Sequence, residues 1–203
     1  VHLREDRRHI QDRDVELLAR TIRTPLNLEL AAVSDVVELA VAWRPHQATL
    51  VPEKREEITT EGGLALSTEA SRRDVGNAVD RLRGAAIRTS LFIDPEETAI
   101  RSSADLGAEA IELHTGEYAD TRGAEREEQL ARISRAAALG RSLGLAVHAG
   151  HGLTYLNVAP VAAVEEIEEL NIGHSIISHA VLVGLERAVR EMVEVVRRAR
   201  GGG

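Results

Sequence analysis

The sequence predicts an α/β protein, a (β/α)8 TIM barrel that lacks its first βα unit in this chain. Short apolar runs alternate with longer segments of helical periodicity, which indicates a parallel sheet with helices outside it. Neither G-x-G-x-x-G nor G-x-x-x-x-G-K occurs, so the commonest nucleotide motifs of open doubly wound sheets are missing. Seven expected strands and a length of 203 residues both fall one βα unit short of a barrel, which typically needs about 250 residues.

The expected strands are short apolar runs bounded by turn residues. Residues 1–3 form the end of a first strand, and the second alternates apolar and polar residues with period two after Pro25. Five later strands are expected over 48–51, 87–93, 108–114, 145–149 and 171–173.

The expected helices lie over 34–43, 69–84, 124–143, 159–170 and 180–200, and another begins near Pro95. We expect Ser34 and Asp94 to cap the helices that follow them. Gly144 should end the long helix in the C′ position. The prediction is therefore one domain over residues 1–200, holding barrel strands two to eight, with a disordered tail over 201–203.

The composition excludes several functional classes. With 25 basic and 33 acidic residues the formal net charge is −8, and aromatic residues make up only 2%. Both argue against a nucleic-acid partner. The absence of cysteine excludes disulfides and thiolate metal sites. No apolar run approaches the roughly 18 residues of a membrane span, so we expect no membrane partner and a cytoplasmic location.

Polar residues collect where the strands end, which is where βα folds carry their chemistry. Five of the eight histidines lie at such positions: His2, His114, His148, His151 and His174. Two glycine-bearing turns, 149–154 and 171–175, follow the last two strands. Barrels often bind phosphate there through backbone N–H groups and a helix N-terminus, although glycine is also an ordinary turn residue. The sequence holds no H-E-x-x-H motif or dense carboxylate cluster, so no metal is expected.

Two further groups are candidates for acid–base chemistry. Alternation places Glu29 on the barrel-interior face of its strand, where burial would raise its pKa toward that of a useful general base. The alternative is an internal salt bridge, for example to Arg4. His2 and Arg4 point the same way and suit an acid–base histidine and a phosphate-binding arginine. Alternatively, they satisfy loop backbone, and the charged run 4–8 is a solvated loop.

Seven stretches resemble one enzyme family over essentially the whole chain. They are VHLREDRRHI (1–10), LNLEL (26–30), LVPEKREEITTEGGL (50–64), SLFIDP (90–95), IELHTGEYAD (111–120), HAGHGLTYLNV (148–158) and NIGHSII (171–177). The family is pyridoxine 5′-phosphate synthase. The resemblance implies a (β/α)8 barrel, usually a homo-octamer, that needs no metal or organic cofactor.

The resemblance also implies substrates and roles. The family is a transferase of vitamin B6 biosynthesis that condenses 3-amino-2-oxopropyl phosphate with 1-deoxy-D-xylulose 5-phosphate to give pyridoxine 5′-phosphate, phosphate and water. By motif, His2 and Glu29 resemble the general bases and His151 the proton donor. Arg4, His9 and Thr59 resemble contacts to the deoxyxylulose phosphate. Gly152, Gly173 and His174 resemble contacts to the aminoketone phosphate.

One departure and two alternatives remain at this point. The family's N-x-D-H-x-A-x-L-R motif is absent, so we expect the 203-residue chain by itself to have little or no synthase activity. The alternatives are a non-catalytic phosphate-binding barrel fragment and another phosphate-binding TIM-barrel lyase or isomerase. The only lysine is Lys54, which argues against a lysine aldolase. The length and charge of segment 53–63 suit a lid, and the sequence leaves open whether it closes over substrate.

Overall fold

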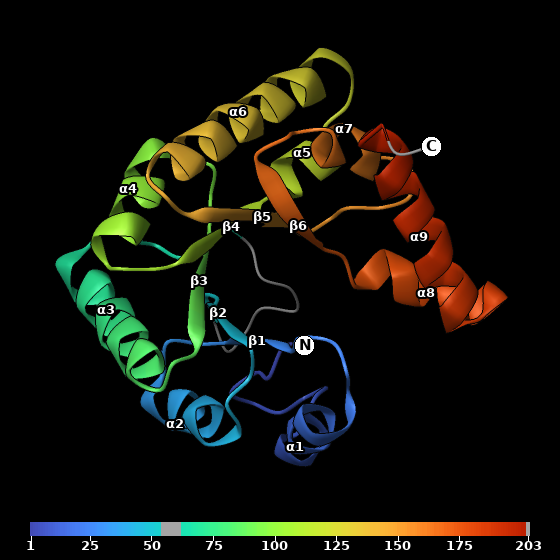
Figure 1. The fold of residues 1–203 in the computed structure, drawn as a ribbon. Helices are drawn as coiled ribbons and strands as arrows, with labels where there is room; N and C mark the ends of the chain where they lie inside the picture. The colour runs from blue at the N-terminus through green and yellow to red at the C-terminus, as the bar shows by residue number, and fades with distance from the viewer. Residues whose placement is uncertain (54–61, 202–203) are drawn as a thin grey trace. The chain divides into compact units, whose positions relative to one another are not determined.

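The computed structural model describes residues 1–53 and 62–201, and the chain divides into two compact units, Val1–Glu112 and Leu113–Gly203 (Figure 1). The strand order in the sheet follows the chain from β1 to β6. The pairs β1–β2, β2–β3 and β5–β6 are parallel. The predicted α/β class with parallel strands is therefore confirmed. Of the expected tail, residues 202–203 lie outside the described residues.

The first unit contains three strands side by side, β1 (Asn27–Leu30), β2 (Gln47–Leu50) and β3 (Arg88–Ile93). β4 (Ala110–His114) carries the boundary between the units. The expected stub at residues 1–3 is present as an isolated parallel bridge from His2 to Glu29. The Leu3 amide donates to the Glu29 carbonyl at 2.9 Å, and the Glu29 amide donates to the Val1 carbonyl at 2.8 Å. The chain's first residues are thereby fixed against β1.

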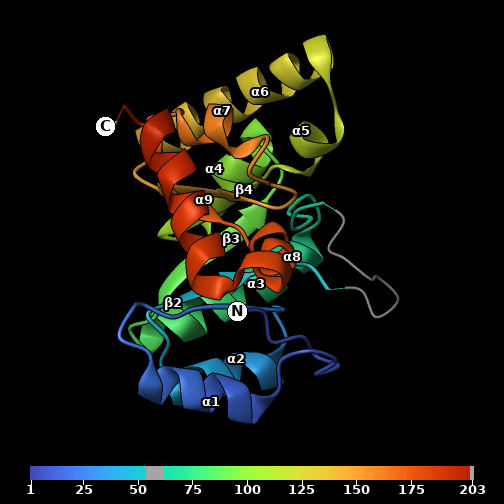
Figure 2. The ribbon, with the colours of Figure 1, turned by 90° about the vertical axis from the view of Figure 1, so that its right-hand side faces the viewer.

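Four helices accompany these strands: α1 (Asp12–Thr21), α2 (Ser34–Trp43), α3 (Glu69–Gly84) and α4 (Glu97–Asp105). α2 and α3 have the bounds that the apolar spacing predicts, and each buries its apolar stripe. α1 lies beside α2 (Figures 1 and 2). It was not expected, because half of its ten residues are charged and only Val15 is buried.

Two expected helix caps are wrong. Val33 occupies the N-cap of α2, so Ser34 is already the first helical residue. α4 begins at Glu97 with Glu96 as its N-cap. The Asp94 carboxylate instead accepts the Gly63 amide at 3.0 Å. A tertiary hydrogen bond has replaced the local cap that the sequence suggests.

The second unit contains α5 (Gly116–Asp120), α6 (Gly123–Ser142), β5 (Ala146–Gly150), α7 (Val158–Ala162), β6 (Ile167–Asn171), α8 (His174–Val183) and α9 (Leu185–Ala199). α9 packs against α7 and α8 (Figure 2). Gly144 follows the C-cap of α6 at φ +82°, which confirms its predicted C′ role. The short helix α5 was not expected.

The expected helix over 159–170 is wrong. Only α7 forms, and residues from Ile167 onward form β6, which pairs with β5. Ladder hydrogen bonds to β5 outweigh the local helical spacing, because intrinsic propensity differs by less than about 1 kcal/mol per residue for ordinary side chains. The strand expected at 171–173 therefore ends at Asn171.

The expected last helix, 180–200, is two helices. Gly184 lies between them at φ +85° and ψ 149°. A left-handed φ costs glycine little and other residues much more, so this residue allows the chain to turn between α8 and α9.

Across the described part of the chain, no helix is both long and apolar enough to cross a bilayer.

Acid should weaken the hydrogen bonds that Glu191 makes within α9 and to His179 on α8. Glu191 accepts Arg187 Nε at 2.7 Å and lies 2.6 Å from His179 Nε2. These hydrogen bonds, the one from Arg187 most strongly, hold the pKa of Glu191 below its ordinary value of 4.5, although partial desolvation acts in the opposite direction. The stabilisation is therefore fully present above pH 4.5 and is lost as the pH falls through the lower folded-state pKa.

Thermal melts across the acidic range test this. The difference in Tm between the protein and Glu191→Gln should be largest near neutrality and shrink in acid. Glu194→Gln is the matched control, because Glu194 lies 3.4 Å from Arg198 on an exposed face of α9. A Tm difference for Glu191→Gln that stays constant with pH would contradict the assignment.

Candidate active site

In the first unit, three side chains from separate stretches meet over β1. His2 Nε2 lies 2.8 Å from Glu53 Oε1, and His2 Nδ1 lies 3.9 Å from Glu29 Oε2. His2 bridges to β1, Glu29 belongs to β1, and Glu53 follows the end of β2 at Leu50. Parallel pairing brings the carboxyl ends of β1 and β2 to one edge, where βα folds place their chemistry.

Glu53 is a buried, ionised carboxylate. Its side chain is 5% exposed, and Oε2 accepts the Glu5 amide at 2.9 Å. Burial alone would raise its pKa. The hydrogen bonds from His2 and the Glu5 amide, with the charges of His2 and Arg4, outweigh burial and hold the pKa of Glu53 below its ordinary value. The carboxylate is therefore an acceptor at neutral pH.

Glu29 only partly follows expectation. Leu28 and Leu30 are fully buried on the opposite face of β1, as alternation predicts. The Glu29 side chain, however, keeps 30% of its surface exposed, so the expected burial of the carboxylate is wrong. Within the described residues, Arg4 Nε lies 3.4 Å from Asp6 Oδ1, and the contact recorded for Glu29 is with His2 rather than with Arg4.

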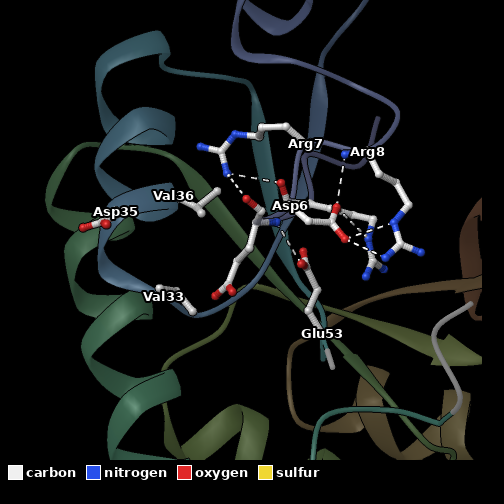
Figure 3. A pocket seen from close by; sticks show the side chains of 9 residues that line it. Asp6, Arg7, Arg8, Val33, Asp35, Val36 and Glu53 are labelled. Atoms are coloured by element: carbon white, nitrogen blue, oxygen red, sulfur yellow. Dashed lines mark hydrogen bonds and ion pairs between the residues drawn. The ribbon is translucent and has the colours of Figure 1, made fainter. Parts of the chain in front are cut away.

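The charged segment 4–8 borders a cavity of about 660 Å³ in this unit. Figure 3 shows Asp6, Arg7 and Arg8 around it, with the Glu53 carboxylate turned toward their segment. The cavity is lined by Arg4, Glu5, Asp6, Arg7, Arg8, Val33, Asp35, Val36 and Glu53.

This segment contains a hydrogen-bonded turn, and its residues Asp6 and Arg8 are exposed to solvent. The Arg7 amide donates to the Arg4 carbonyl at 3.0 Å, and Arg7 has φ +52°. Arg4 is only 8% exposed and lines this cavity together with Arg7 and Arg8. Guanidinium groups can bind an anionic ligand there, although four carboxylates share the lining. His9 lies exposed just beyond the turn, and Thr59 lies outside the described residues.

In the second unit, the turn after β5 is fixed by three side chains from outside β5. Thr115 Oγ1 donates to the carbonyls of Gly150 and His151 at 2.7 and 2.5 Å. The Tyr118 hydroxyl donates to the Asn157 carbonyl at 2.6 Å. Asn157 in turn accepts the Thr154 amide at 2.6 Å and donates to the Gly152 carbonyl at 3.1 Å. The turn that carries His151 is therefore held in one conformation.

His151 and Gly152 both adopt left-handed backbone conformations, at φ +82° and +73°. For a residue other than glycine this is strained and persists where the surroundings impose it. A Cβ on Gly152 would lie 2.6 Å from the Ala119 Cβ, so close packing also requires glycine there. The exposed His151 ring stacks obliquely on His114, with centroids 4.9 Å apart.

The second glycine turn leads directly into α8. Gly173 is the N-cap residue and His174 the first helical residue, and both are exposed. A Cβ on Gly173 would meet nothing within 4 Å, so packing does not demand glycine there. An open backbone at the start of a ten-residue helix is suited to anion binding.

His148 does not lie at a strand end, contrary to expectation. It lies within β5 and is fully buried. Its ring nitrogens lie 3.6 Å from Glu168 Oε1 and 3.7 Å from Glu169 Oε1, so it contacts the neighbouring strand β6. In the described residues, no three His, Asp or Glu side chains are arranged to hold a metal ion.

Sequence reasoning missed Glu53 and the Thr115–Tyr118–Asn157 bracing. The position of Glu53, directly after a buried strand and Pro52, was an available signal. The hydrogen bonds from Thr115 and Tyr118 had no such signal, because they join residues 35 to 39 positions apart.

Removing the Tyr118 hydroxyl should destabilise the second unit. Tyr118 is 1% exposed, and burial raises its pKa, so the hydroxyl remains a donor. Tyr118→Phe leaves the Asn157 carbonyl without this donor and should lower the free energy of unfolding by about 1–3 kcal/mol. Urea denaturation measures the loss.

Tyr155→Phe is the matched control, because the Tyr155 hydroxyl donates at 2.8 Å to the Ala188 carbonyl from a half-buried position. Its loss should cost less, about 0.5–1.5 kcal/mol. Equal unfolding midpoints for Tyr118→Phe and the unchanged protein would contradict the bracing role.

Fold and site together define an α/β protein with acid–base and anion-binding side chains at the ends of parallel strands. The chain belongs to the family described as pyridoxal phosphate biosynthesis protein PdxJ, whose model matches residues 1–198.

Two similar relatives carry the same name. Pyridoxine 5′-phosphate synthase of Synechococcus sp. (strain WH7803) is 54% identical over 200 residues, which are 98% of this chain and 80% of the relative. The synthase of Trichlorobacter lovleyi is 56% identical over 199 residues, 98% of this chain and 82% of the relative.

A solved structure shares the fold. A mandelate oxidase mutant aligns with a TM-score of 0.63 at 14% identity, over 92% of this chain and 60% of that one.

Proposed function

We propose that the protein is a pyridoxine 5′-phosphate synthase, a transferase of vitamin B6 biosynthesis. It condenses 3-amino-2-oxopropyl phosphate with 1-deoxy-D-xylulose 5-phosphate and releases inorganic phosphate and water. Family membership over residues 1–198 supports this reaction. The observation that carries it is the pairing of His2 with Glu29 at a strand edge. The alternatives, a non-catalytic fragment or another barrel lyase, are not favoured by these relatives.

His2 and Glu29 act as general bases, and His151 acts as the proton donor. Joining an amine to a ketone and closing a ring requires repeated proton transfers at carbon and oxygen. Imidazole and carboxylate groups held in place perform such transfers near neutral pH. The braced conformation of the His151 turn supports its role, since a proton donor must be held within hydrogen-bond reach of its target.

The two phosphate groups are bound differently. Arg4, His9 and Thr59 bind 1-deoxy-D-xylulose 5-phosphate, and the buried Arg4 guanidinium beside the 660 Å³ cavity supports this assignment. Gly152, Gly173 and His174 bind the aminoketone phosphate. The open backbone at the start of α8 supports that site.

The architecture proposed for this reaction is a (β/α)8 barrel, with residues 1–200 in one domain and the His2 stub as one of its strands. Sequential parallel strands support it. We also propose a cytoplasmic homo-octamer with no cofactor.

The test is conversion of the two substrates by the purified protein extended upstream by a segment that carries the family's N-x-D-H-x-A-x-L-R motif, because the 203-residue chain by itself is expected to have little or no synthase activity. The kinetic comparisons below use this extended protein. Pyridoxine 5′-phosphate is quantified by chromatography, and inorganic phosphate by colorimetry. We expect both products to form together and only when both substrates are present. Binding of both substrates without formation of pyridoxine 5′-phosphate would refute the proposal.

A further inference from the structure

We propose that Glu53 is a positioning residue that holds neutral His2 as its Nε2–H tautomer, leaving Nδ1, on the Glu29 side, as the proton-accepting atom. The inference rests on the proposed function and deepens it, because it names which nitrogen of the base reacts and what selects that nitrogen.

The first step is the state of Glu53. Its side chain is 5% exposed, and Oε2 is already occupied by the Glu5 amide at 2.9 Å. The hydrogen bonds and neighbouring charges that hold its pKa low keep the carboxylate ionised near neutral pH. An ionised carboxylate only accepts hydrogen bonds.

The second step is the position of the proton on His2. His2 Nε2 lies 2.8 Å from Glu53 Oε1, which is hydrogen-bond distance. Because Glu53 can only accept, Nε2 must carry the hydrogen. A neutral imidazole carries one N–H, so its lone pair then resides on Nδ1. A carboxylate that fixes a histidine tautomer in this way is a recurrent device in active sites.

The third step is the direction of the free nitrogen. Nδ1 lies 3.9 Å from Glu29 Oε2, which exceeds a hydrogen bond and leaves both basic atoms able to take a proton from substrate. When a substrate C–H or N–H bond breaks, its electron pair stays on the substrate and the proton binds the Nδ1 lone pair. The resulting imidazolium donates through Nε2 to Glu53 and faces Glu29 through Nδ1, so each N–H of the cation faces a carboxylate.

A purely structural role for Glu53 makes a different prediction. If the contact only tied residues 1–5 to the end of β2, it would contribute to stability alone. The rate of the reaction would then not depend on which nitrogen of neutral His2 carries the hydrogen. Stability and the tautomer in the unchanged protein are the same for both roles, because the hydrogen bond itself requires a protonated Nε2. The roles are separated by kcat in Glu53→Gln, which keeps a hydrogen bond to His2 while inverting its tautomer.

Nitrogen-15 NMR of the histidine-labelled protein tests the tautomer directly. His2 signals are assigned by their loss in His2→Gln, and spectra are recorded at a pH where the ring is neutral. We expect a protonated Nε2 and an unprotonated Nδ1. The opposite tautomer in the unchanged protein would overturn the proposal, and this measurement needs no variant of Glu53.

Glu53→Gln sharpens the test. The glutamine oxygen can keep the Glu5 amide, which turns its NH₂ group toward His2 Nε2. The tautomer should then invert, with the hydrogen on Nδ1 and no lone pair on the Glu29 side. Glu38→Gln is the matched control, because it breaks the ion pair between Glu38 on α2 and Arg81 on α3 of the same unit. It should leave the His2 signals unchanged.

The kinetic arm separates this inference from the proposed function. Glu53→Gln should lower kcat at least tenfold with little change in KM. The residues that bind substrate are unchanged, whereas Nδ1 of His2 then carries a hydrogen and cannot accept a proton from substrate. An unchanged tautomer in folded Glu53→Gln would overturn the positioning role even in an active synthase. Conversely, the expected tautomers in a protein that forms no product would refute the synthase function and leave the His2–Glu53 arrangement intact.

Discussion

Replacing Glu29 with glutamine should lower kcat for pyridoxine 5′-phosphate formation by about 10²–10⁴-fold, the usual contribution of a general base. Glutamine matches glutamate in shape but accepts no proton at neutral pH. The measurement is initial rate at saturating concentrations of both substrates. KM should change little, because the residues assigned to phosphate binding are unchanged in this variant.

The fold should tolerate this change. The Glu29 side chain is 30% exposed, and among the described residues its Oε2 atom lies 3.9 Å from His2 Nδ1. The free energy of unfolding should therefore change by no more than about 0.5 kcal/mol, as for most substitutions away from buried networks. Glu38→Gln again serves as the control and should retain full activity. If Glu29→Gln keeps its activity within a few-fold, Glu29 is not a base in this reaction.

The elements that sequence patterns predicted are those whose apolar stripe is also their buried face. α2 and α3 were placed at their bounds because Val36, Val37, Val75 and Val79 recur at helical spacing and are all buried. The strand expected at 171–173 was placed too late, and most of β6 was predicted as helix, because its sequence, IEELN, is short and has no strand pattern of its own. It becomes a strand only through pairing with β5, and such non-local hydrogen bonds leave no local signal.

In the candidate site, too, the residue types could be predicted from local sequence, whereas the contacts between distant residues could not. His2 and Glu29 could be singled out because polar residues in or beside an apolar strand are unusual and costly unless paired. The contact between His2 and Glu53 could not, since it joins residues 51 positions apart. It depends on the register that places β2 beside β1. The residue types at the site are thus readable from sequence, whereas their partners and tautomers follow from tertiary pairing.

Replacing Gly63 with alanine should destabilise the first unit by about 3 kcal/mol or more. An added Cβ would lie 2.3 Å from the Asp94 amide nitrogen and 2.4 Å from the Ile93 carbonyl carbon. Both atoms belong to main chain at the end of β3, which cannot rotate away as a side chain can. The segment must therefore move and lose the Gly63–Asp94 and Leu64–Phe92 hydrogen bonds. Steric overpacking typically costs about 1–3 kcal/mol, and each lost bond adds roughly 1 kcal/mol.

Urea unfolding monitored by circular dichroism measures this loss, and Gly84→Ala is the matched control. Gly84 is the last residue of α3, and a Cβ there would meet nothing within 4 Å. Alanine at that position should be neutral or stabilise by up to about 1 kcal/mol, because it restricts the unfolded chain and favours the helix. The two substitutions add the same methyl group, so a large difference between them isolates the close approach of residue 63 to β3. Equal midpoints for the two variants would show that the chain at residue 63 can move away from β3 at little cost.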